Sequence, residues 1–346
     1  MDGCKGEIRY PVEAPPGPGE ALEIAPGVLW MRLPLPTALD HVNVYALDDG
    51  AAGWTVIDTG MDTPKARELW EQLLAGPLGG RPVHRQIVTH MHPDHIGLTA
   101  WMAGKGAELW CTRTTWLSAR MLVLNVEEKH SEHTIDFWRA SGMAPEMLAR
   151  KAAERPFNFI DVVGLPPPSF RRIAEGDWLT VGGRRWLVRC GDGHAPEHAT
   201  LWSEDGTLVL GGDQLLPSIS PNLGVYASEP LADPIAEWLE SCNRLAAHAT
   251  EAQLVLPGHK LPFTGLPLRL RQKAENHHHA LERLHAHLAT PRVAVDCFGP
   301  LFKREVTPEV FGFALAETIA HLNHLYLTGR ASRTARADGA WLWRAI

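Results

Sequence analysis

Three histidines and one aspartate lie within six consecutive residues, directly after a short apolar run. The run is Gln86-Ile87-Val88, and the clustered residues are His90, His92, Asp94 and His95. An apolar run of this kind favours a buried strand, whereas imidazole nitrogen and carboxylate oxygen are ligands of zinc and similar ions. The sequence therefore predicts a metal site at a strand end, in a fold that brings further ligands to it.

The spacing divides this cluster into two pairs of ligands. His90 and His92 point the same way in an extended chain, because side chains there alternate with a period of two. Asp94 and His95 follow Pro93, where the chain must turn. One pair can hold a first ion and the other pair a second, provided that distant segments supply the missing ligands.

Three other apolar runs end in glycine-containing turns that carry metal-competent side chains. These are residues 186–190 with His194, residues 207–210 with Asp213, and residues 253–256 with His259. Runs of this composition favour strands, and loops at the ends of a rigid sheet are where binding residues gather. The sequence thus predicts that the missing ligands come from strand ends.

In these ordered motifs the sequence resembles the metallo-β-lactamase-fold hydrolases, which include glyoxalase II, ribonuclease Z, lactonases and many thioesterases. The resemblance covers roughly residues 25 to 265. It implies one ion held by His90, His92 and His194, a second held by Asp94, His95 and His259, and Asp213 as the bridge between them. It also implies that Asp58 supports the ligands without binding metal.

The residue at position 92 separates branches of this family. Members with a di-iron centre that reduces oxygen or nitric oxide typically show Glu there, so His92 favours hydrolysis. Persulfide dioxygenases, which keep one iron, retain the same motif and remain an alternative. No ligand position carries Cys, which distinguishes the chain from lactamases with a cysteine ligand.

Strand-like runs and a helix precede the metal motif. The runs are residues 28–33, 41–47 and 54–58, and the helix begins at Thr63-Pro64 and ends near residue 75. Strands that alternate with helices, in two halves that each end in ligands, predict a four-layer α/β sandwich. The resemblance implies the same αβ/βα arrangement. We expect an extension at residues 1–24, a catalytic domain at 25–265 and a C-terminal domain at 266–346.

Residues 114–168 interrupt this pattern with helical spacing of apolar residues, including Trp116, Leu117 and Met121. The segment lies between the ligands His95 and His194. It can cover the metal site as a lid that offers an apolar surface to an acyl chain. Alternatively, its Met and aromatic residues pack on the sandwich.

The C-terminal segment shows two helical patterns and a hairpin. The helices are expected at residues 268–289 and 308–327, and the hairpin, at 331–346, turns at Asp338-Gly339. This order resembles the winged-helix module of the LACTB-like branch. The second helix has no Lys or Arg, so binding of duplex DNA is not expected. A packing or homodimer role is favoured, with contact to single strands or a coenzyme A phosphate left open through Arg330, Arg333 and Arg336.

The remaining histidines are interpreted as surface or packing residues. They include a pair in the insertion, a triplet in the first C-terminal helix, a pair in the second, and a companion of His194 four residues on. These are His130 and His133, His277 to His279, His321 and His324, and His198.

Composition limits the cellular setting. The five cysteines are dispersed without C-x-x-C spacing, which is typical of free thiols, and no apolar stretch is long enough for secretion or membrane spanning. The formal net charge of −7 gives no general attraction to nucleic acid or anionic membrane. We expect a cytoplasmic protein. The cysteines are Cys4, Cys111, Cys190, Cys242 and Cys297.

Together these features predict a binuclear metal hydrolase acting on a thioester or ester of a small acyl substrate. A metal-bridging hydroxide is the expected nucleophile, with Asp94 or Asp213 orienting it and moving its proton. Zn²⁺ is the expected metal, although the ligands also suit Mn²⁺ and Fe²⁺. The alternatives are an endoribonuclease or phosphodiesterase on single-stranded RNA, a mono-iron persulfide dioxygenase, and a non-catalytic winged-helix interaction protein. Substrate-binding residues are not assigned.

Overall fold

A computed structural model describes residues 6–303 and 305–346 of the chain. These residues form two compact units. The first unit is Met1–Val126, Asn158–Pro221 and Arg244–Leu270, and the second is Glu127–Phe157, Asn222–Asn243 and Arg271–Ile346. Cys4 lies outside the described residues, and the other four cysteines are buried free thiols.

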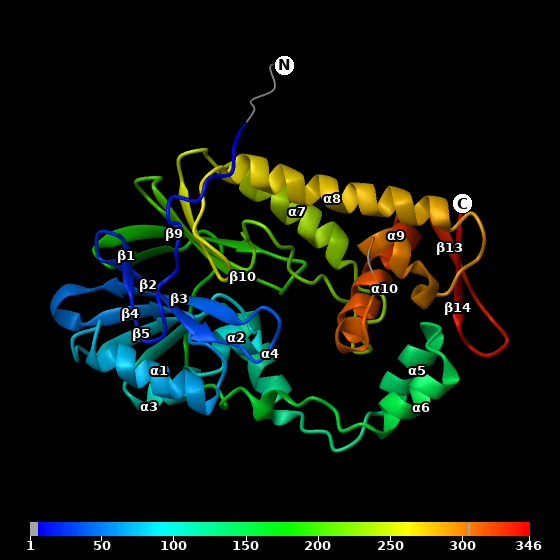
Figure 1. Ribbon diagram of the computed structural model, residues 1–346, viewed down its shortest axis with the longest axis horizontal. Coiled ribbons are helices and arrows are strands. Elements are labelled where there is room, and N and C mark those ends of the chain that lie inside the picture. The colour runs from blue at the N-terminus through cyan, green and yellow to red at the C-terminus, as the bar shows by residue number, and fades with distance from the viewer. Residues whose placement is uncertain (1–5, 304) are drawn as a thin grey trace. The chain divides into compact units, whose positions relative to one another are not determined.

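The first unit contains two mixed sheets (Figure 1). In the seven-stranded sheet, order β1 to β7, the first four strands pair antiparallel and β4 to β7 pair parallel. In the five-stranded sheet, order β12-β11-β10-β9-β8, only β11 and β12 are parallel. The first sheet comprises β1 (Leu22–Ala25), β2 (Val28–Pro34), β3 (His41–Asp48), β4 (Trp54–Ile57), β5 (Val83–Ile87), β6 (Glu108–Cys111) and β7 (Arg171–Arg172). The second comprises β8 (Trp178–Val181), β9 (Arg184–Gly191), β10 (His198–Ser203), β11 (Leu208–Gly212) and β12 (Leu254–Pro257).

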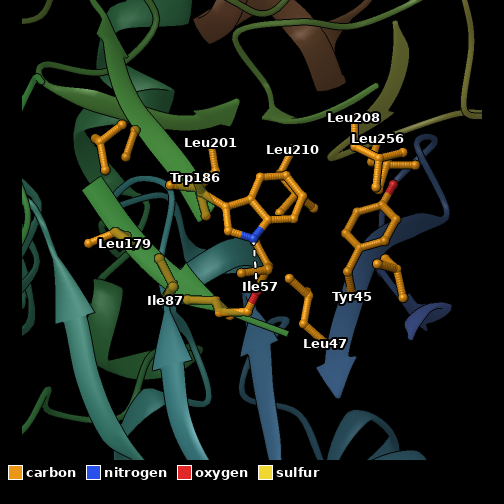
Figure 2. Packing of buried hydrophobic residues seen from close by; sticks show 14 of the residues in the cluster. Tyr45, Leu47, Ile57, Ile87, Leu179, Trp186, Leu201, Leu208, Leu210 and Leu256 are labelled. Atoms are coloured by element: carbon orange, nitrogen blue, oxygen red, sulfur yellow. Dashed lines mark hydrogen bonds between the residues drawn. The ribbon is translucent and has the colours of Figure 1, made fainter. Parts of the chain in front are cut away.

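Alternation along the strands produces two apolar layers. In β3, Tyr45 and Leu47 face the second sheet, where they join Trp186 in the cluster shown in Figure 2. Val44 and Ala46 point to the opposite face and pack with helical residues. Each fully buried side chain of this size contributes roughly 1.5–3 kcal/mol, so the sheets hold the loops at their ends on a rigid base.

Helices of the first unit are α1 (Pro64–Ala75), α2 (Pro93–Ile96), α3 (Thr99–Gly104) and α4 (Arg113–Leu124), with short 3-10 turns at Gly50–Ala52 and Phe159–Asp161. Helix α1 starts where predicted, because the Thr63 hydroxyl accepts a hydrogen bond from the Ala66 amide at 3.1 Å. Its buried residues Leu69, Trp70 and Leu73 pack on the outer face of the first sheet.

The second unit contains α5 (Glu132–Ala140), α6 (Pro145–Ala153), α9 (Phe298–Phe302), α10 (Phe311–Leu327) and the hairpin of β13 (Ala331–Ala335) and β14 (Trp341–Ala345), with 3-10 turns at Ala294–Cys297 and Pro308–Val310. Helices α7 (Pro234–Ala246) and α8 (Leu266–His287) contribute residues to both units. The hairpin turns as expected, with Gly339 at φ 88°.

The predicted fold class is confirmed: an α/β sandwich with two mixed sheets and a small C-terminal part that includes a hairpin. The segment predicted as an insertion is largely helical, with α4 in the first unit and α5 and α6 in the second. Its role as a lid and the domain boundaries stay predictions. Strand β1 was not expected, since it lies mostly in the predicted extension and owes its order to pairing with β2. No described helix has the length and apolar character that a bilayer span requires.

Candidate metal centre

The strand ends of both sheets carry the predicted site residues. Asp58 and the 90–95 cluster follow the parallel pair β4 and β5, and Asp213 and His259 follow the parallel pair β11 and β12. His194 lies in the turn between β9 and β10. Since parallel neighbours end at the same edge of a sheet, these loops meet. The structure brings all seven predicted ligands together.

The first set of donors consists of three ring nitrogens. His92 Nδ1 lies 2.9 Å from His90 Nε2 and 3.0 Å from His194 Nε2. Burial, followed by the neighbouring His194, lowers the pKa of His92 to about 3, so its ring is neutral at physiological pH. Ring nitrogens that converge in this way can direct lone pairs to a common point, as metal ligands do.

The second set combines a carboxylate with two imidazoles. Asp94 Oδ2 lies 3.3 Å from His259 Nε2 and 3.7 Å from His95 Nε2. Asp213 lies between the two sets: its Oδ2 is 3.2 Å from His259 Nε2 and 3.6 Å from His194 Nε2. This placement gives Asp213 one carboxylate to share between two cations.

Without metal, the carboxylates and the second pair of imidazoles stabilise one another as charges. Burial alone lowers the pKa of His259, but Asp213 and Asp94 outweigh it and raise the value to about 9. Burial raises the pKa of Asp94, but the charge of His95 and the bond from His259 lower it to about 2. The carboxylates are therefore ionised near neutrality, and bound cations can replace the protons on the imidazoles.

The donor atoms fit divalent cations. Two buried polar atoms, His95 Nε2 and Asp213 Oδ1, have no hydrogen-bond partner among the described residues, although they lie 3.5 Å apart. Buried polar atoms of folded proteins are rarely left unsatisfied. Nitrogen and oxygen donors in two adjoining groups match a binuclear centre, and they leave the metal identity open.

Asp58 contacts two side chains next to the centre and through them orients two of the imidazoles. Its carboxylate accepts from His95 Nδ1 at 2.7 Å and from the Thr89 hydroxyl at 2.9 Å. Because that hydroxyl donates to Asp58, it can accept the Nδ1 proton of His90 at 3.0 Å. Both rings are thus held with Nε2 facing the centre.

Two further histidines in this network were not predicted from the sequence. The fully buried His198 accepts from the Asp213 amide through Nε2 at 3.1 Å, and its ring stacks on His90 with centroids 4.5 Å apart. The carbonyl of His41 accepts from His259 Nδ1 at 2.8 Å. His198 could have been found as the fourth residue after a ligand at a strand start, whereas His41 carries no such signal.

A glycine permits the close approach of the two halves. A Cβ atom on Gly258 would lie 2.2 Å from Asp213 Oδ1 and 2.8 Å from His95 Cε1. Both contacts are far inside van der Waals distance, so any side chain at position 258 must displace a ligand. The Gly258 amide also donates to the Gly212 carbonyl at 2.8 Å, which ties the two ligand loops together.

One side of the centre is accessible. His90, His95 and His259 are buried, whereas His92 and Asp94 are partly exposed. The side chain of Asp94 is 18% exposed and that of His194 is 6% exposed. Asp94 is therefore the carboxylate of the centre that solvent reaches most readily.

Comparison with known proteins agrees with this geometry. The model of the metallo-beta-lactamase superfamily matches residues 37–259, and that of the metallo-beta-lactamase-like C-terminal domain matches residues 281–346. Over 311 residues the chain is 26% identical to "Probable metallo-hydrolase YqjP" of Bacillus subtilis (strain 168), which covers 86% of this chain and 92% of that protein.

Two solved structures resemble the whole chain. A beta-lactamase domain protein from Burkholderia ambifaria is 36% identical, with 98% of each chain covered and a TM-score of 0.90. The metallo-beta-lactamase family protein TTHA1429 from Thermus thermophilus is 29% identical, with 93% of this chain and 100% of that chain covered and a TM-score of 0.77. Both likenesses extend through the C-terminal part.

Proposed function

Because the chain belongs to the metallo-beta-lactamase superfamily, we propose that it hydrolyses an ester or thioester of a small acyl substrate with two divalent cations, most readily Zn²⁺. Metal-dependent hydrolysis is supported by the family, by the name of the Bacillus relative and by the His/Asp cluster. The single observation that carries the binuclear part is the position of Asp213 between two complete donor sets.

The positions of the residues assign them to metal binding or to proton transfer. His90, His92 and His194 would hold one cation, and Asp94, His95 and His259 the other, with Asp213 shared. When bound, the cations supply an acidified water and a Lewis acid for the substrate carbonyl. Asp94 is ionised and partly exposed. It is therefore the better placed of the two candidate carboxylates to accept the proton of the attacking water and pass it to the leaving group.

The acyl preference is supported by helix α4. Leu117, Met121 and Leu124 on this helix are 52%, 61% and 62% exposed. The N-terminus of α4 is joined to the His194 loop, because the Thr114 amide donates to Glu197 at 3.0 Å. An exposed apolar stripe that begins beside a metal-ligand loop suits an acyl chain better than a polyanion.

The proposal is tested by metal analysis followed by turnover assays on the full chain. We expect two ions per chain, hydrolysis of p-nitrophenyl acetate and hexanoyl-coenzyme A, loss of both activities with a chelator, and recovery with Zn²⁺. His92→Ala should lower kcat/KM by more than about 100-fold, beyond the loss expected when only a supporting residue is removed.

His278→Ala provides a matched control, since His278 is an exposed histidine outside the centre and should retain normal rates. Hydrolysis that survives complete metal removal, or His92→Ala at the wild-type rate, would contradict the proposal. Metal-dependent cleavage of single-stranded RNA without turnover of either ester would instead support the ribonuclease alternative.

A further inference from the structure

A basic pocket lies beside the metal centre in the first unit. It has a volume of about 350 Å³ and is lined by Tyr10, Arg32, Asp40, His41, Ser218, Lys260 and Leu261. Its wall is directly connected to a predicted ligand: the His41 carbonyl accepts from His259 Nδ1, and the two rings are 6.1 Å apart. Lys260 is the next residue after that ligand.

The Arg32 guanidinium of the pocket is held in place by its neighbours. Arg32 donates to Asn43 Oδ1 and to the Lys260 carbonyl, both at 3.1 Å, and its guanidinium lies over the Trp30 ring. Within the described part of the chain, neither Arg32 nor Lys260 forms an ion pair with a carboxylate. A fixed guanidinium and a lysine ammonium without a counterion are well suited to bind an anion.

The acidic residue of the pocket, Asp40, forms its hydrogen bond with His41 rather than with either cation. Asp40 accepts a hydrogen bond from His41 Nδ1, and His41 Nε2 accepts from the Lys260 amide at 3.0 Å. Two cations and one carboxylate leave the pocket with a net positive charge, before any bound metal adds to it.

Backbone strain is concentrated at the same place. Among the described residues, five that are not glycine have a left-handed φ, and two of them, Asp40 at 59° and Lys260 at 69°, line this pocket. Such conformations cost free energy, and they cluster where a site needs a fixed geometry. The hydrogen bonds of the Lys260 amide to His41 and of Arg32 to the Lys260 carbonyl fix this conformation in the turn that also carries His259.

We propose that this pocket is a substrate subsite that binds an anionic end group, a carboxylate or phosphate, through Arg32 and Lys260. The inference rests on the proposed function, with the scissile carbonyl at the metal centre. Half-esters and half-thioesters of dicarboxylic acids carry a scissile carbonyl and an anionic end group on one short chain.

Binding is tested on metal-free full-length protein, in which an anion has no metal to bind. Succinate and inorganic phosphate are titrated separately while the amide NMR signals of Lys260 and Leu261 are followed. We expect saturable shifts with at least one of the two anions, and the stronger of the two identifies the end group. Absence of saturable shifts with both anions would overturn the proposal.

Three variants distinguish a charge effect from a structural one. Lys260→Gln should weaken anion binding about fivefold or more, as expected for one unit charge near water. Asp40→Asn should strengthen it, since it removes a negative charge and Asn tolerates the left-handed backbone. Lys65→Gln, which removes an exposed charge from α1, is the matched control and should have no effect. Equal affinity in Lys260→Gln and wild type would overturn the role of Lys260.

Kinetics of the metal-loaded enzyme test whether the subsite serves the substrate. Lys260→Gln should raise KM for mono-p-nitrophenyl succinate about fivefold, a larger change than it produces in KM for p-nitrophenyl acetate, which has no anionic end group. An unchanged KM for the succinate ester would contradict a substrate subsite. If wild type hydrolyses neither ester, the proposed function fails, whereas the anion titration still decides whether the pocket binds anions.

Discussion

Two groups of buried histidines differ in what surrounds them. In the metal centre, imidazoles from several loops converge with Asp94 and Asp213, and burial lowers the pKa of His92 while the carboxylates raise that of His259. In the second unit, the pair His277 and His321 is buried with ring centroids 5.4 Å apart.

This second pair is arranged for packing. His277 Nδ1 lies 3.2 Å from His321 Nε2, and His321 Nδ1 donates to the Glu317 carbonyl at 2.8 Å. Burial lowers the pKa of His277 to about 3 and that of His321 to about 4. Among the described residues no third donor completes a metal-binding group there. Convergence of carboxylates and ring nitrogens, rather than buried histidine itself, is what distinguishes a metal centre.

The largest effect is expected from removing the shared carboxylate. Asp213→Asn should abolish binding of at least one ion and lower kcat/KM by more than about 100-fold, beyond the loss for a supporting residue. Asp233→Asn is the matched control, because Asp233 pairs with His324 in the second unit at 3.1 Å. Metal content measured by mass spectrometry and ester turnover check both variants. If Asp213→Asn still bound two ions tightly, the converging carboxylate would not be what distinguishes the metal centre from the packing pair.

A steric change at the centre should have the next largest effect. Gly258→Ala places a methyl group against Asp213 and His95, so we expect metal affinity to fall by about 100-fold, the upper range for loss of ligand orientation. In Gly299→Ala the added methyl meets no atom within 4 Å, and metal affinity should not change. Competition with a fluorescent chelator measures both. Equal affinities in the two variants would show that the close approach is unimportant.

Loss of ligand orientation alone should have a smaller effect. Asp58→Asn keeps the shape of the side chain and suits its φ of 60°, but weakens the hold on His95 and Thr89. We expect kcat/KM to fall about 10- to 100-fold while saturating metal still binds. A stopped assay over a range of Zn²⁺ concentrations separates a loss of turnover from a loss of metal affinity. Wild-type kinetics in Asp58→Asn would contradict the orienting role.

The packing pair should affect stability and its pH dependence only. Because the folded pKa values of His277 and His321 are lowered, unfolding takes up protons as pH falls below the unfolded value near 6.5. The free energy of unfolding therefore keeps the full contribution of these histidines above that pH, and the contribution declines as pH falls towards about 4. Each histidine then costs about 1.4 kcal/mol of stability per pH unit.

His277→Gln should reduce this slope by about the share of one histidine, and turnover at pH 7 should stay normal. Urea unfolding of chelated wild type and variant at pH 7, 6 and 5 checks the slope. Parallel stability curves for the two proteins would show that His277 is not a buried neutral group.

The sequence identified the converging residues because each one leaves a visible pattern. His90, Asp213 and His259 each follow an apolar run, which leads into a glycine-containing turn for Asp213 and His259, and the structure puts them just after strands β5, β11 and β12. Whether each binds metal stays a prediction. So do the placement in the glyoxalase II or LACTB-like branch, the winged-helix interpretation, the homodimer and the cytoplasmic location.

Features that depend on tertiary contact were not predictable. His41 acts through a bond to His259 that no local pattern indicates. The spacing of His198 from His194 is visible in the sequence, but its bond to Asp213 is not. The basic pocket joins Arg32 and Lys260, which are 228 residues apart in the chain. Strand β1 and the single-turn helix α2 were missed for the same reason, since pairing and packing rather than propensity order such short segments.

The most direct test of the two-ion centre is anomalous X-ray diffraction from crystals of the full chain grown with Zn²⁺, recorded on both sides of the zinc absorption edge. The account predicts two anomalous peaks, one among His90, His92 and His194 and the other among Asp94, His95 and His259. Peaks only elsewhere in the molecule, or none in fully supplemented crystals, would contradict it.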